Sequence, residues 1–356
     1  MNFVHIAHAI SYGDGASGQV IAMDKMFREM GLDSCIYAGK FDPKLGAGIK
    51  LFDEYRYKSG DIPIFHFSTG TSFVNKILQL PIPIVLYYHN ITPAEHFAGI
   101  AWGSYFSARK GRRQLLQLRE KTAFAWAASE YSRQELAEYG FRQTSVMPII
   151  VDFTEYESVG QDATIVDRFR DGKINILFVG RVTPHKKQED IIRVLFYYKR
   201  FIDSNVRLVL VGGQKESYVS GLRSLIGELG LENDVVFSGK VSFEELCTYY
   251  KVADVFVCMS EHEGFCIPLV EASYFDLPVF AFSAAAIPFT MGNSGVLFER
   301  KDYPVVAEAI RLLAGDSQTR QKIISAQRKR VADFGVEKIR QGVEKDLTAI
   351  KNLLLW

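Results

Sequence analysis

Short apolar runs alternate along this chain with longer segments in which apolar positions recur at helical spacing. A short apolar run bounded by glycine or proline is typical of a buried strand, and a period near 3.6 residues is typical of a helix. The predicted strands cover residues 3–9, 34–38, 62–67, 84–88, 174–179, 207–211, 235–237, 254–259 and 278–282. The predicted helices cover residues 20–30, 102–125, 131–139, 188–203, a segment from 218, 243–250, 303–314 and 317–354. Regular alternation of strands and helices predicts an α/β protein built on parallel sheets.

The chain is long enough for two such sheets. Its 356 residues exceed the size at which one hydrophobic core usually divides into two. Residues 154–173 are polar, contain glycines and have no convincing strand, so we place the linker there. We therefore expect two Rossmann-like, doubly wound domains, one over residues 1–160 and the other over residues 161–337.

Composition narrows the class of protein. The chain is 48% hydrophobic and has no repeated or biased segment, as expected for an ordinary globular protein. A net charge of +1 argues against nucleic acid as the main partner. The amino terminus lacks a charged leader and no window is apolar enough to span a bilayer. The four cysteines show no metal-type spacing, so we expect a cytoplasmic protein with buried thiols.

Two carboxylates stand around the predicted start of one helix. Glu263 and Glu271 are separated by seven residues, and Pro268 between them suits the first turn of a helix. Backbone N–H groups of Gly264, Phe265 and Cys266 would have no partner within that helix, so they can point at a ligand. Carboxylates and N–H groups together suit the hydroxyls of a nucleotide-linked sugar, although a glutamate near a helix start is also favoured by the dipole alone.

A complementary basic motif lies upstream. Gly180 and Arg181 follow the predicted strand 174–179, and Lys186 comes five residues after Arg181. Glycine permits close backbone approach, arginine can fork onto two phosphate oxygens, and lysine supplies a compact charge. We therefore expect these residues to hold a diphosphate.

Together, Gly-Arg-x4-Lys and Glu-x7-Glu resemble the donor half of retaining glycosyltransferases with the GT-B fold, a large group that includes bacterial mannosyl- and glucosyltransferases. The similarity extends to Ser129-Glu-Tyr-Ser132 before a helix and to a strand ending at Val151-Asp152. By this resemblance, the last helix, about residues 338–356, crosses back onto the first domain.

The resemblance implies a role for each candidate residue. Arg181 and Lys186 would hold the diphosphate, Glu263 the sugar hydroxyls and Glu271 the ribose, with Leu269 on the same helix lining the donor site. Backbone at Gly239 and Val241 would lie against the base, and His89 would stand near the transferred sugar. The glycine-rich turn around Gly15 could present N–H groups to the distal phosphate.

The implied reaction moves a hexose from a nucleotide-diphosphate sugar, GDP-mannose or UDP-glucose, to a glycan or lipid-linked acceptor with retention. No Asp-x-Asp pair ends a strand of the second domain and the basic residues supply the positive charge, so we expect no metal and no cofactor. The chain departs from the family pattern at Lys187, Asp276 and Phe289, and at residues 284–286, three alanines where glycines are common.

Other interpretations remain open. A nicotinamide dehydrogenase is excluded because no Gly-x-Gly-x-x-Gly follows a strand with an acidic residue at the right distance. A nucleotide-sugar epimerase, a phosphorylase or a non-catalytic glycosyltransferase-like subunit would share the fold. The basic segment 109–121 and its neighbours Trp102, Tyr105 and Phe106 could contact anionic lipid at the inner membrane face, or form a plain solvated helix face.

Overall fold

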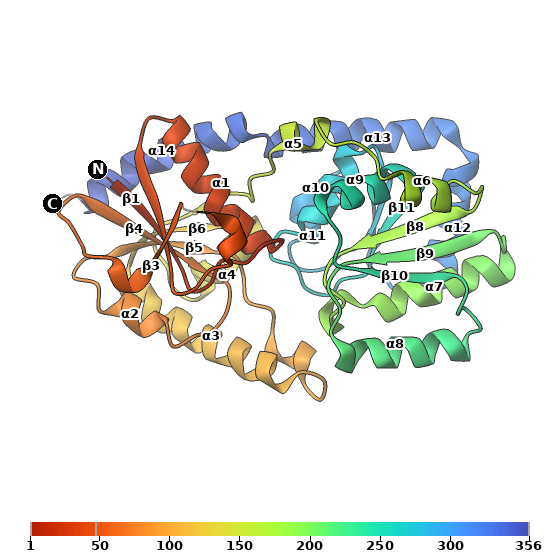
Figure 1. The fold of residues 1–356 in the computed structure, drawn as a ribbon, viewed down its shortest axis with the longest axis horizontal. Coiled ribbons are helices and arrows are strands. Elements are labelled where there is room, and N and C mark those ends of the chain that lie inside the picture. The colour runs from red at the N-terminus through yellow and green to blue at the C-terminus, as the bar shows by residue number, and fades with distance from the viewer. Residues whose placement is uncertain (1, 47, 355–356) are drawn as a thin grey trace. The chain divides into compact units, whose positions relative to one another are not determined.

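The computed structural model describes residues 2–46 and 48–354, which form two compact units. Unit 1 comprises Met1–Glu95, Trp102–Asp152 and Asp333–Trp356. Unit 2 comprises His96–Ala101 and Phe153–Ala332. Each unit is built around one parallel sheet (Figure 1). The prediction of two doubly wound α/β domains is therefore confirmed.

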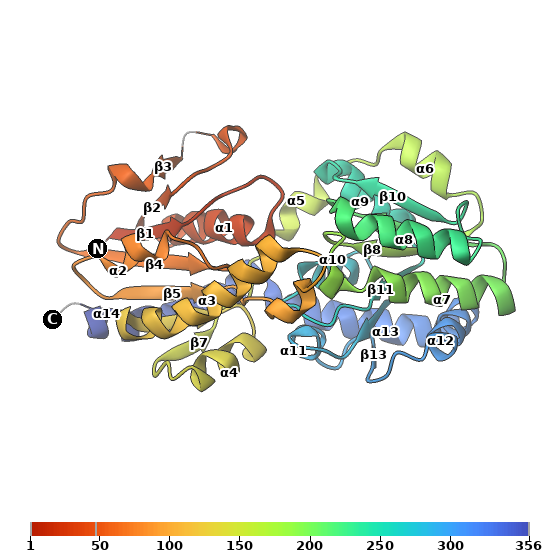
Figure 2. The ribbon, with the colours of Figure 1, turned by 90° about the horizontal axis from the view of Figure 1, so that it is seen from below.

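Unit 1 contains a seven-stranded parallel sheet in the order β3-β2-β1-β4-β5-β6-β7. Its strands are β1 (Asn2–Ala7), β2 (Asp33–Ala38), β3 (Ile49–Leu51), β4 (Asp61–Phe67), β5 (Ile84–Tyr88), β6 (Thr122–Ala127) and β7 (Thr144–Val146). Its helices are α1 (Gly15–Glu29), α2 (Val74–Leu78), α3 (Trp102–Lys121), α4 (Glu130–Glu138) and α14 (Val336–Leu354). Helices α1 and α14 cover one face of the sheet, and α2 and α3 cover the other (Figures 1 and 2). Every residue of β4 is buried, as expected for a central strand covered on both faces.

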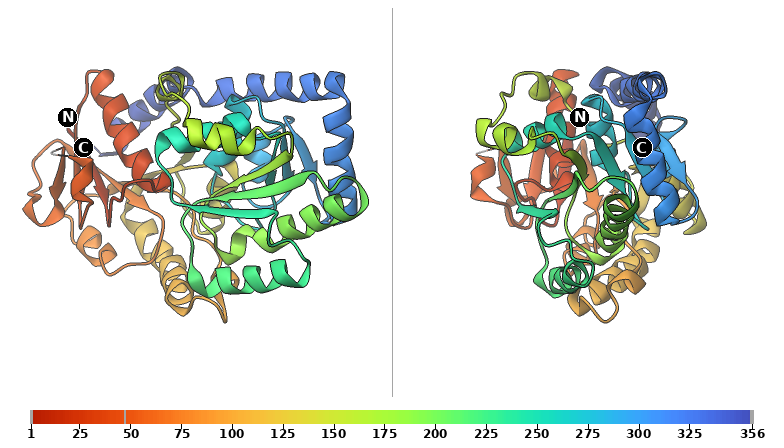
Figure 3. Two further views of the ribbon diagram at one scale, coloured as in Figure 1. Left: turned by 45° about the vertical axis from the view of Figure 1, so that its right-hand side comes forward. Right: turned by 90° about the vertical axis from the view of Figure 1, so that its right-hand side faces the viewer.

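Unit 2 contains a six-stranded parallel sheet in the order β10-β9-β8-β11-β12-β13. Its strands are β8 (Ile174–Val179), β9 (Val206–Val211), β10 (Val235–Gly239), β11 (Val255–Cys258), β12 (Val279–Phe282) and β13 (Val296–Phe298). Its helices are α5 (Phe153–Glu157), α6 (Ala163–Phe169), α7 (Gln188–Phe201), α8 (Glu216–Glu228), α9 (Phe243–Val252), α10 (Ile267–Tyr274), α11 (Ile287–Met291), α12 (Tyr303–Gly315) and α13 (Ser317–Val331). Figure 3 shows these helices on both faces of the sheet. Ligand-binding loops of such sheets follow the carboxyl ends of the strands.

Several element boundaries differ from the sequence-based predictions, and the helical segment expected over residues 317–354 is divided into α13 and α14. Helix α1 begins at Gly15 rather than at residue 20, because the Asp14 carboxylate accepts the Ser17 N–H at 3.1 Å and caps the helix. Helix α3 ends at Lys121, since the following segment, with Phe124 and Trp126 at alternate positions, forms β6. The strand expected to end at Asp152 ends at Val146, two residues before Pro148, which has no N–H for a ladder.

The segment expected to be a linker is part of the second unit's architecture. Residues 153–157 and 163–169 form α5 and α6, and Ile165 and Phe169 are buried in the unit 2 core. Apart from the short segment His96–Ala101, which belongs to unit 2, the units change over at Asp152/Phe153 and at Ala332/Asp333. The last helix lies on unit 1, where the Trp126 indole donates to Asp346 Oδ2 at 2.7 Å. Over the residues that the structure describes, no helix combines the length and apolar character that crossing a bilayer requires.

Candidate functional site

The loop that carries Glu263 connects β11 to α10, with Pro268 in the first turn of that helix. Cys266 is the N-cap residue and has a left-handed backbone, with φ of 74°. Two hydrogen bonds fix the loop: Ala286 N donates to Glu263 O at 3.3 Å, and Thr290 Oγ1 donates to Phe265 O at 2.5 Å. Gly264, Phe265 and Cys266 therefore lie on an ordered turn, and Leu269 is buried in the helix that follows.

Lys186 and Glu263 meet directly, although 77 residues separate them. Lys186 ends a short 3-10 helix, Pro184–Lys186, after β8, and β8 is the neighbour of β11 in the sheet. Lys186 Nζ donates to Glu263 Oε1 at 2.5 Å and to Oε2 at 2.6 Å. Burial alone would lower the pKa of Lys186, but the Glu263 carboxylate outweighs it and raises that pKa, so the lysine is charged at neutral pH.

Arg181 follows β8 and is exposed, and its guanidinium has no ion-pair partner among residues 2–46 and 48–354. The neighbouring Gly180 has φ of 150°. A Cβ atom placed on Gly212, at the end of β9, would lie 2.2 Å from Gly180 O. Glycine is therefore required at position 212 because the ends of β8 and β9 approach closely. The sequence-based expectation concerned only Gly180 and the approach of a ligand.

Glu271 is buried in α10 and is held by two tyrosines that the sequence analysis missed. Tyr156 OH donates to Glu271 Oε1 at 2.7 Å, and Tyr250 OH donates to Oε2 at 2.8 Å. Burial raises the pKa of Glu271, and the two hydroxyls offset only part of that rise. Because a carboxylate has about four acceptor positions, Glu271 keeps capacity for further donors such as ribose hydroxyls.

The base-side candidates lie at neighbouring strand ends of unit 2. Gly239, with φ of 73°, ends β10, and its carbonyl accepts the Gly212 N–H at 2.9 Å. Val241 follows two residues later and is half-buried. The structure therefore places Gly180, Gly212 and Gly239 along the carboxyl edge of β8, β9 and β10.

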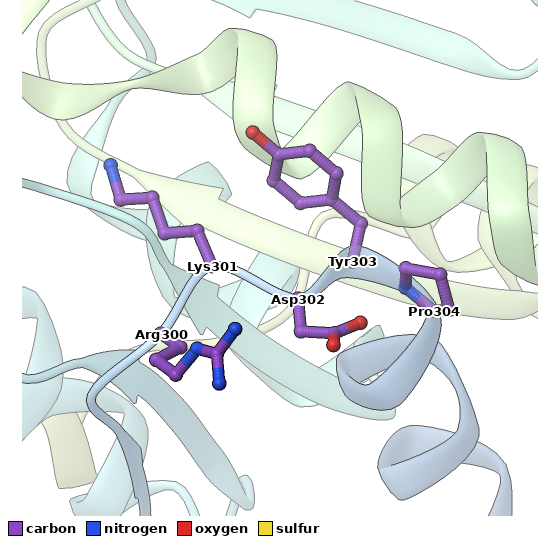
Figure 4. Close-up of a pocket in the computed structure, with 5 residues that line it drawn as sticks. All are labelled: Arg300, Lys301, Asp302, Tyr303 and Pro304. Carbon is purple, nitrogen blue, oxygen red and sulfur yellow. The ribbon is translucent and has the colours of Figure 1, made fainter.

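A second charged group surrounds Glu261. Lys301 Nζ lies 2.8 Å from Glu261 Oε1 and 2.7 Å from Asp190 Oδ2, and Lys187 Nζ lies 3.4 Å from Glu261 Oε2. Burial would raise the pKa of Glu261, but Lys301 and then Lys187 hold it below its ordinary value. Residues 300–304 line a shallow pocket here, in which Lys301 and Tyr303 point to the side opposite the Asp302 carboxylate (Figure 4). Since Lys301 and Tyr303 are bound to Asp190, we interpret this group as support for the loop rather than as a ligand site.

Two candidates lie in unit 1. His89 follows β5 and is half-buried, and burial lowers its pKa to about 4, opposed by the charge of Asp14. Asp14 directly precedes Gly15, so the structure brings His89 and the amino end of α1 into one region of unit 1. The glycine-rich turn expected over residues 13–18 is shorter, because Gly15 to Gly18 already belong to α1.

One group of potential metal ligands occurs in the part of the chain that the structure describes. Cys258 Sγ, Cys266 Sγ and a Glu263 oxygen lie within 4.8 Å of one another, all on buried residues. Both Glu263 oxygens, however, already accept from the Lys186 ammonium. A cation placed there would face that positive charge, so the arrangement fits a metal poorly.

Three of the departures from the family pattern share a backbone feature, which Phe289 does not have. Lys187, Asp276 and Ala285 have φ of 53°, 56° and 50°. Glycine adopts this left-handed region without steric cost, whereas a residue with a Cβ is strained there. At each of these three positions the backbone therefore has a conformation that glycine would adopt without strain.

The sequence comparisons agree with this geometry. Residues 164–330 match the family described as "Glycosyl transferases group 1". The D-inositol 3-phosphate glycosyltransferase of Streptomyces avermitilis is 29% identical over 167 residues, which are 45% of this chain and 36% of the relative. The GDP-mannose-dependent alpha-(1-6)-phosphatidylinositol monomannoside mannosyltransferase of Mycobacterium tuberculosis is 30% identical over 164 residues, 43% of this chain and 42% of the relative. This chain therefore matches less than half the length of these curated relatives.

Solved structures extend the similarity to both units. Anabaena HepE in complex with UDP-glucose has a TM-score of 0.78 at 19% identity, over 98% of this chain and 100% of HepE. WaaG, described as a glycosyltransferase involved in lipopolysaccharide biosynthesis, has a TM-score of 0.70 at 14% identity, over 99% of both chains. Residues 164–330 are therefore similar to the group 1 glycosyl transferases, and the chain has the two-domain GT-B fold.

Proposed function

We propose that this protein is a glycosyltransferase that moves a hexose from a nucleotide-diphosphate sugar to a glycan or lipid-linked acceptor. The observation that carries the proposal is the contact between Lys186 Nζ and both Glu263 oxygens, 2.5 and 2.6 Å apart, at the carboxyl ends of neighbouring strands. A basic group for diphosphate and an acidic group for sugar hydroxyls are thereby held at one point of unit 2. The names of the relatives, which include GDP-mannose-dependent enzymes, support the same class of donor.

In the proposed reaction, Arg181 and Lys186 bind the diphosphate. As the bond from the sugar to the diphosphate breaks, negative charge builds on the leaving oxygen, and fixed cations stabilise that charge without reorganisation. Arg181 is exposed and unpaired among the described residues, so it can move onto the phosphate. Lys186 is already ordered by Glu263 and supplies a charge in place before the donor arrives.

Glu263 and Glu271 are proposed to orient the donor. Glu263 would accept from sugar hydroxyls, with Gly264, Phe265, Cys266 and Leu269 shaping the turn beside it. Glu271 would accept from the ribose, while Tyr156 and Tyr250 keep its carboxylate in place. Gly239 and Val241 would contact the base through backbone atoms.

In unit 1, His89 and the amino end of α1 at Gly15 are proposed to contact the transferred sugar and the distal phosphate. Retention of the anomeric configuration is proposed by family resemblance, with the leaving phosphate taking the acceptor proton. We propose that neither a metal nor a cofactor takes part, since Lys186 and Arg181 supply the positive charge.

We propose that the donor is a hexose nucleotide of the GDP-mannose or UDP-glucose type. The mannosyltransferase relative supports the first, and the HepE complex with UDP-glucose supports the second. A role in cell-surface polysaccharide or glycoconjugate synthesis follows from such donors and acceptors. The three alanines at residues 284–286 leave less room beside the sugar than glycines would.

A thermal-shift panel of UDP, GDP, ADP and the corresponding nucleotide sugars tests donor binding. Release of the nucleoside diphosphate from the preferred nucleotide sugar tests transfer. We expect one nucleotide to raise the midpoint by several degrees at a concentration of about 100 times its Kd. Arg181→Ala should abolish most of that shift, whereas Arg200→Ala, on the exposed last turn of α7, should leave it unchanged. No shift with any nucleotide would refute the proposal.

Product analysis separates the alternatives of the same fold. An epimerase would change the sugar nucleotide without an acceptor, and a phosphorylase would require inorganic phosphate. A non-catalytic partner subunit would bind the nucleotide but give no turnover with any acceptor extract. Transfer that requires an acceptor and releases the nucleoside diphosphate identifies the glycosyltransferase.

We propose that the protein acts at the cytoplasmic face of a membrane through the exposed face of α3. Trp102 and Phe106 are 56% and 62% exposed, and their ring centroids lie 6.2 Å apart. Arg109, Lys110 and Arg113 are exposed on the same helix, whereas Arg112 binds Glu135 at 2.6 Å and serves the fold. Exposed aromatics beside basic residues suit an anionic headgroup layer.

Sedimentation with vesicles of phosphatidylglycerol and phosphatidylcholine at low salt tests this contact. The wild type should sediment with anionic vesicles only, and Trp102→Ala/Phe106→Ala should remain in the supernatant. Phe201→Ala, which removes an aromatic side chain 70% exposed in unit 2, is the matched control. Equal sedimentation of the wild type with and without anionic lipid would remove the membrane proposal.

A further inference from the structure

Three histidines from neighbouring strands of unit 1 form a chain of ring-to-ring contacts. His5 lies in β1, His66 in β4, and His89 directly after β5. His5 Nδ1 lies 3.1 Å from His66 Nε2, and His66 Nδ1 lies 3.2 Å from His89 Nε2. Both distances are those of hydrogen bonds, so each pair of rings must share one proton between two nitrogens.

The register of the sheet explains why the rings meet. His5 is opposite Ile64, two residues before His66, and His66 is opposite Tyr87, two residues before His89. Steps of two residues keep all three side chains on one face of the sheet, because successive side chains alternate between faces. The row of three histidines therefore runs diagonally across β1, β4 and β5 towards the carboxyl ends of these strands.

Aromatic packing holds the chain in place. The His66 ring stacks on Tyr87 with centroids 5.2 Å apart, and Phe27 packs edge-on against His5 at 5.3 Å. Tyr87 is itself fixed, because its hydroxyl donates to Met147 O at 2.8 Å. Burial lowers the pKa of His5 to about 3 and of His66 well below its ordinary value, so both rings are neutral near pH 7.

The buried end of the chain sets the direction of its hydrogen bonds. A neutral imidazole has one donor and one acceptor nitrogen, so the donors must all point one way along the chain. His5 is fully buried, and its Nε2 has no partner among the described residues. A buried N–H without an acceptor is a rarer and more costly state than a bare lone pair, so the proton of His5 belongs on Nδ1.

We propose that His5 and His66 are positioning residues that fix the tautomer of His89. His5 Nδ1–H donates to His66 Nε2, and His66 Nδ1–H donates to His89 Nε2. His89 then carries its own proton on Nδ1 and presents a hydrogen-bond donor, not a base, to a ligand oxygen at the carboxyl end of the unit 1 sheet. For a sugar ligand this role rests on the proposed function, but the tautomer itself does not.

The three hydrogen-bonded histidines hold their protons in fixed positions and do not conduct a proton. Conduction of a proton would require an exit at its far end, and His5 has no exposed surface. The charges that face the chain are Arg28 near His5, which disfavours a charged ring there, and Asp14 near His89. Asp14 favours a proton on the His89 side of the chain, in agreement with the proposed direction.

Nitrogen-15 NMR of labelled histidine tests the tautomer without any substrate, because protonated and bare imidazole nitrogens have different chemical shifts. His89→Gln assigns the resonances. We expect His89 of the wild type to be protonated at Nδ1. In His5→Leu the ratio of the two His89 tautomers should move about 3- to 10-fold towards Nε2–H, as expected for loss of one hydrogen-bond preference.

His5→Asn is the conservative control, since the amide nitrogen of asparagine falls near the position of imidazole Nδ1 and can donate in its place. It should restore the wild-type tautomer ratio, and it should restore turnover that His5→Leu lowers by about 3- to 10-fold. A purely structural role would lower stability in His5→Leu without changing the tautomer ratio.

A wild-type His89 protonated at Nε2 would overturn the proposal, as would an unchanged ratio in folded His5→Leu. If His5→Leu does not fold, the His89 tautomer in the wild type and in His5→Asn tests the proposal. The expected tautomers in a protein that transfers no sugar would support the positioning role and count against the proposed function alone.

Discussion

Lys186 Nζ lies within 2.6 Å of both carboxylate oxygens of Glu263, with each side chain supplied by a different strand end of unit 2. The side chains are 15% and 8% exposed, so water screens this pair far less than it screens a surface pair. The pair orders the loop in the absence of a ligand. It also means that a donor must share or displace an existing contact.

Removing one member of this pair should destabilise the protein more than removing both. Lys186→Met leaves the buried Glu263 carboxylate unpaired and should cost about 3 kcal/mol of unfolding free energy. The double variant Lys186→Met/Glu263→Gln should recover more than half of that loss, because no charge remains buried. Urea unfolding measures both.

The exposed pair of Arg311 and Glu308 provides the matched control. Glu308→Gln should change the unfolding free energy far less than Lys186→Met does, since surface pairs contribute little. A double variant as unstable as the sum of its single variants would show that Lys186 and Glu263 do not stabilise one another.

Tyr156→Phe should destabilise the protein in a pH-dependent way. Its hydroxyl donates to the buried Glu271 carboxylate, and loss of a hydrogen bond to a charged group costs about 1.5 to 3 kcal/mol. The variant raises the pKa of Glu271 further, so the folded state holds its proton to higher pH than the unfolded state does. Its stability relative to wild type should therefore be lower at about pH 8 than at about pH 5.

Urea unfolding at the two pH values measures this difference. Tyr274→Phe is the control, because its hydroxyl lies 3.4 Å from Phe153 O and makes at most a weak hydrogen bond. A loss of stability in Tyr156→Phe that is equal at both pH values would place its cause in packing and not in the Glu271 charge.

Local sequence signals predicted the elements of the site but not their partners. Gly180-Arg181-x4-Lys186 and Glu263-x7-Glu271 lie where an apolar strand gives way to a loop, and Pro268 marks the helix start. The strand pairs and the return of the last helix to unit 1 agree with the expected fold. The motifs and the helix start depend on periodicity and on residues close in sequence, whereas the return of the last helix was implied only by the family resemblance.

The missed features depend on contacts between distant segments. Tyr156 and Glu271 are 115 residues apart, and Tyr156 lies in a polar segment that resembles a linker. His5 meets His66 only through the strand register, which no local pattern specifies. The early start of α1 had a local signal, since Asp14 precedes Ser17 at capping distance in sequence.

The unfolding free energy should fall as the pH drops from about 6.5, the ordinary pKa of histidine, towards about 4. His5 and His89 have folded-state pKa values of about 3 and about 4, so the unfolded chain binds more protons than the folded chain in this window. Stability therefore rises with pH there, by up to about 1.4 kcal/mol for each unit of pKa difference per histidine. Urea unfolding between these pH values measures the slope.

The His5→Asn variant isolates the buried ring from other titrating groups. Asparagine does not titrate, so the slope of stability against pH should be shallower than in the wild type by the contribution of one histidine. A wild-type stability that is constant across this window would show that the rings are not buried as neutral groups.

Ala285→Gly should stabilise the protein. Ala285 has φ of 50°, where a Cβ costs an L-residue roughly 1 to 2 kcal/mol, and the greater freedom of glycine in the unfolded chain offsets part of the gain. A net increase of about 0.5 to 1 kcal/mol is expected in urea unfolding. Ala309→Gly, in the interior of α12, should instead lose about 1 kcal/mol. Equal losses at both positions would mean that the left-handed backbone carries no strain.

Gly70 and Gly111 bring a loop against the backbone of α3, and alanine at either position should be strongly destabilising. A Cβ on Gly70 would lie 2.3 Å from Gly111 N and 2.3 Å from Ser107 O, both main-chain atoms that cannot rotate away. We expect Gly70→Ala to cost about 3 kcal/mol or more, at the upper end of overpacking effects, because the helix must shift.

Gly103→Ala, on the same helix, is the matched control. A Cβ there meets no atom within 4 Å, and alanine favours the helix over glycine, so the variant should gain up to about 1 kcal/mol. Opposite signs in urea unfolding would assign the Gly70 effect to the contact with α3 and not to a general change in helix propensity. Since Arg112 lies beside Gly111 and donates to Ile91 O at 2.8 Å, a shift of α3 should also disturb the loop after His89. The tautomer spectrum of His89 in Gly70→Ala should then differ from that of the wild type, whereas Gly103→Ala should reproduce it.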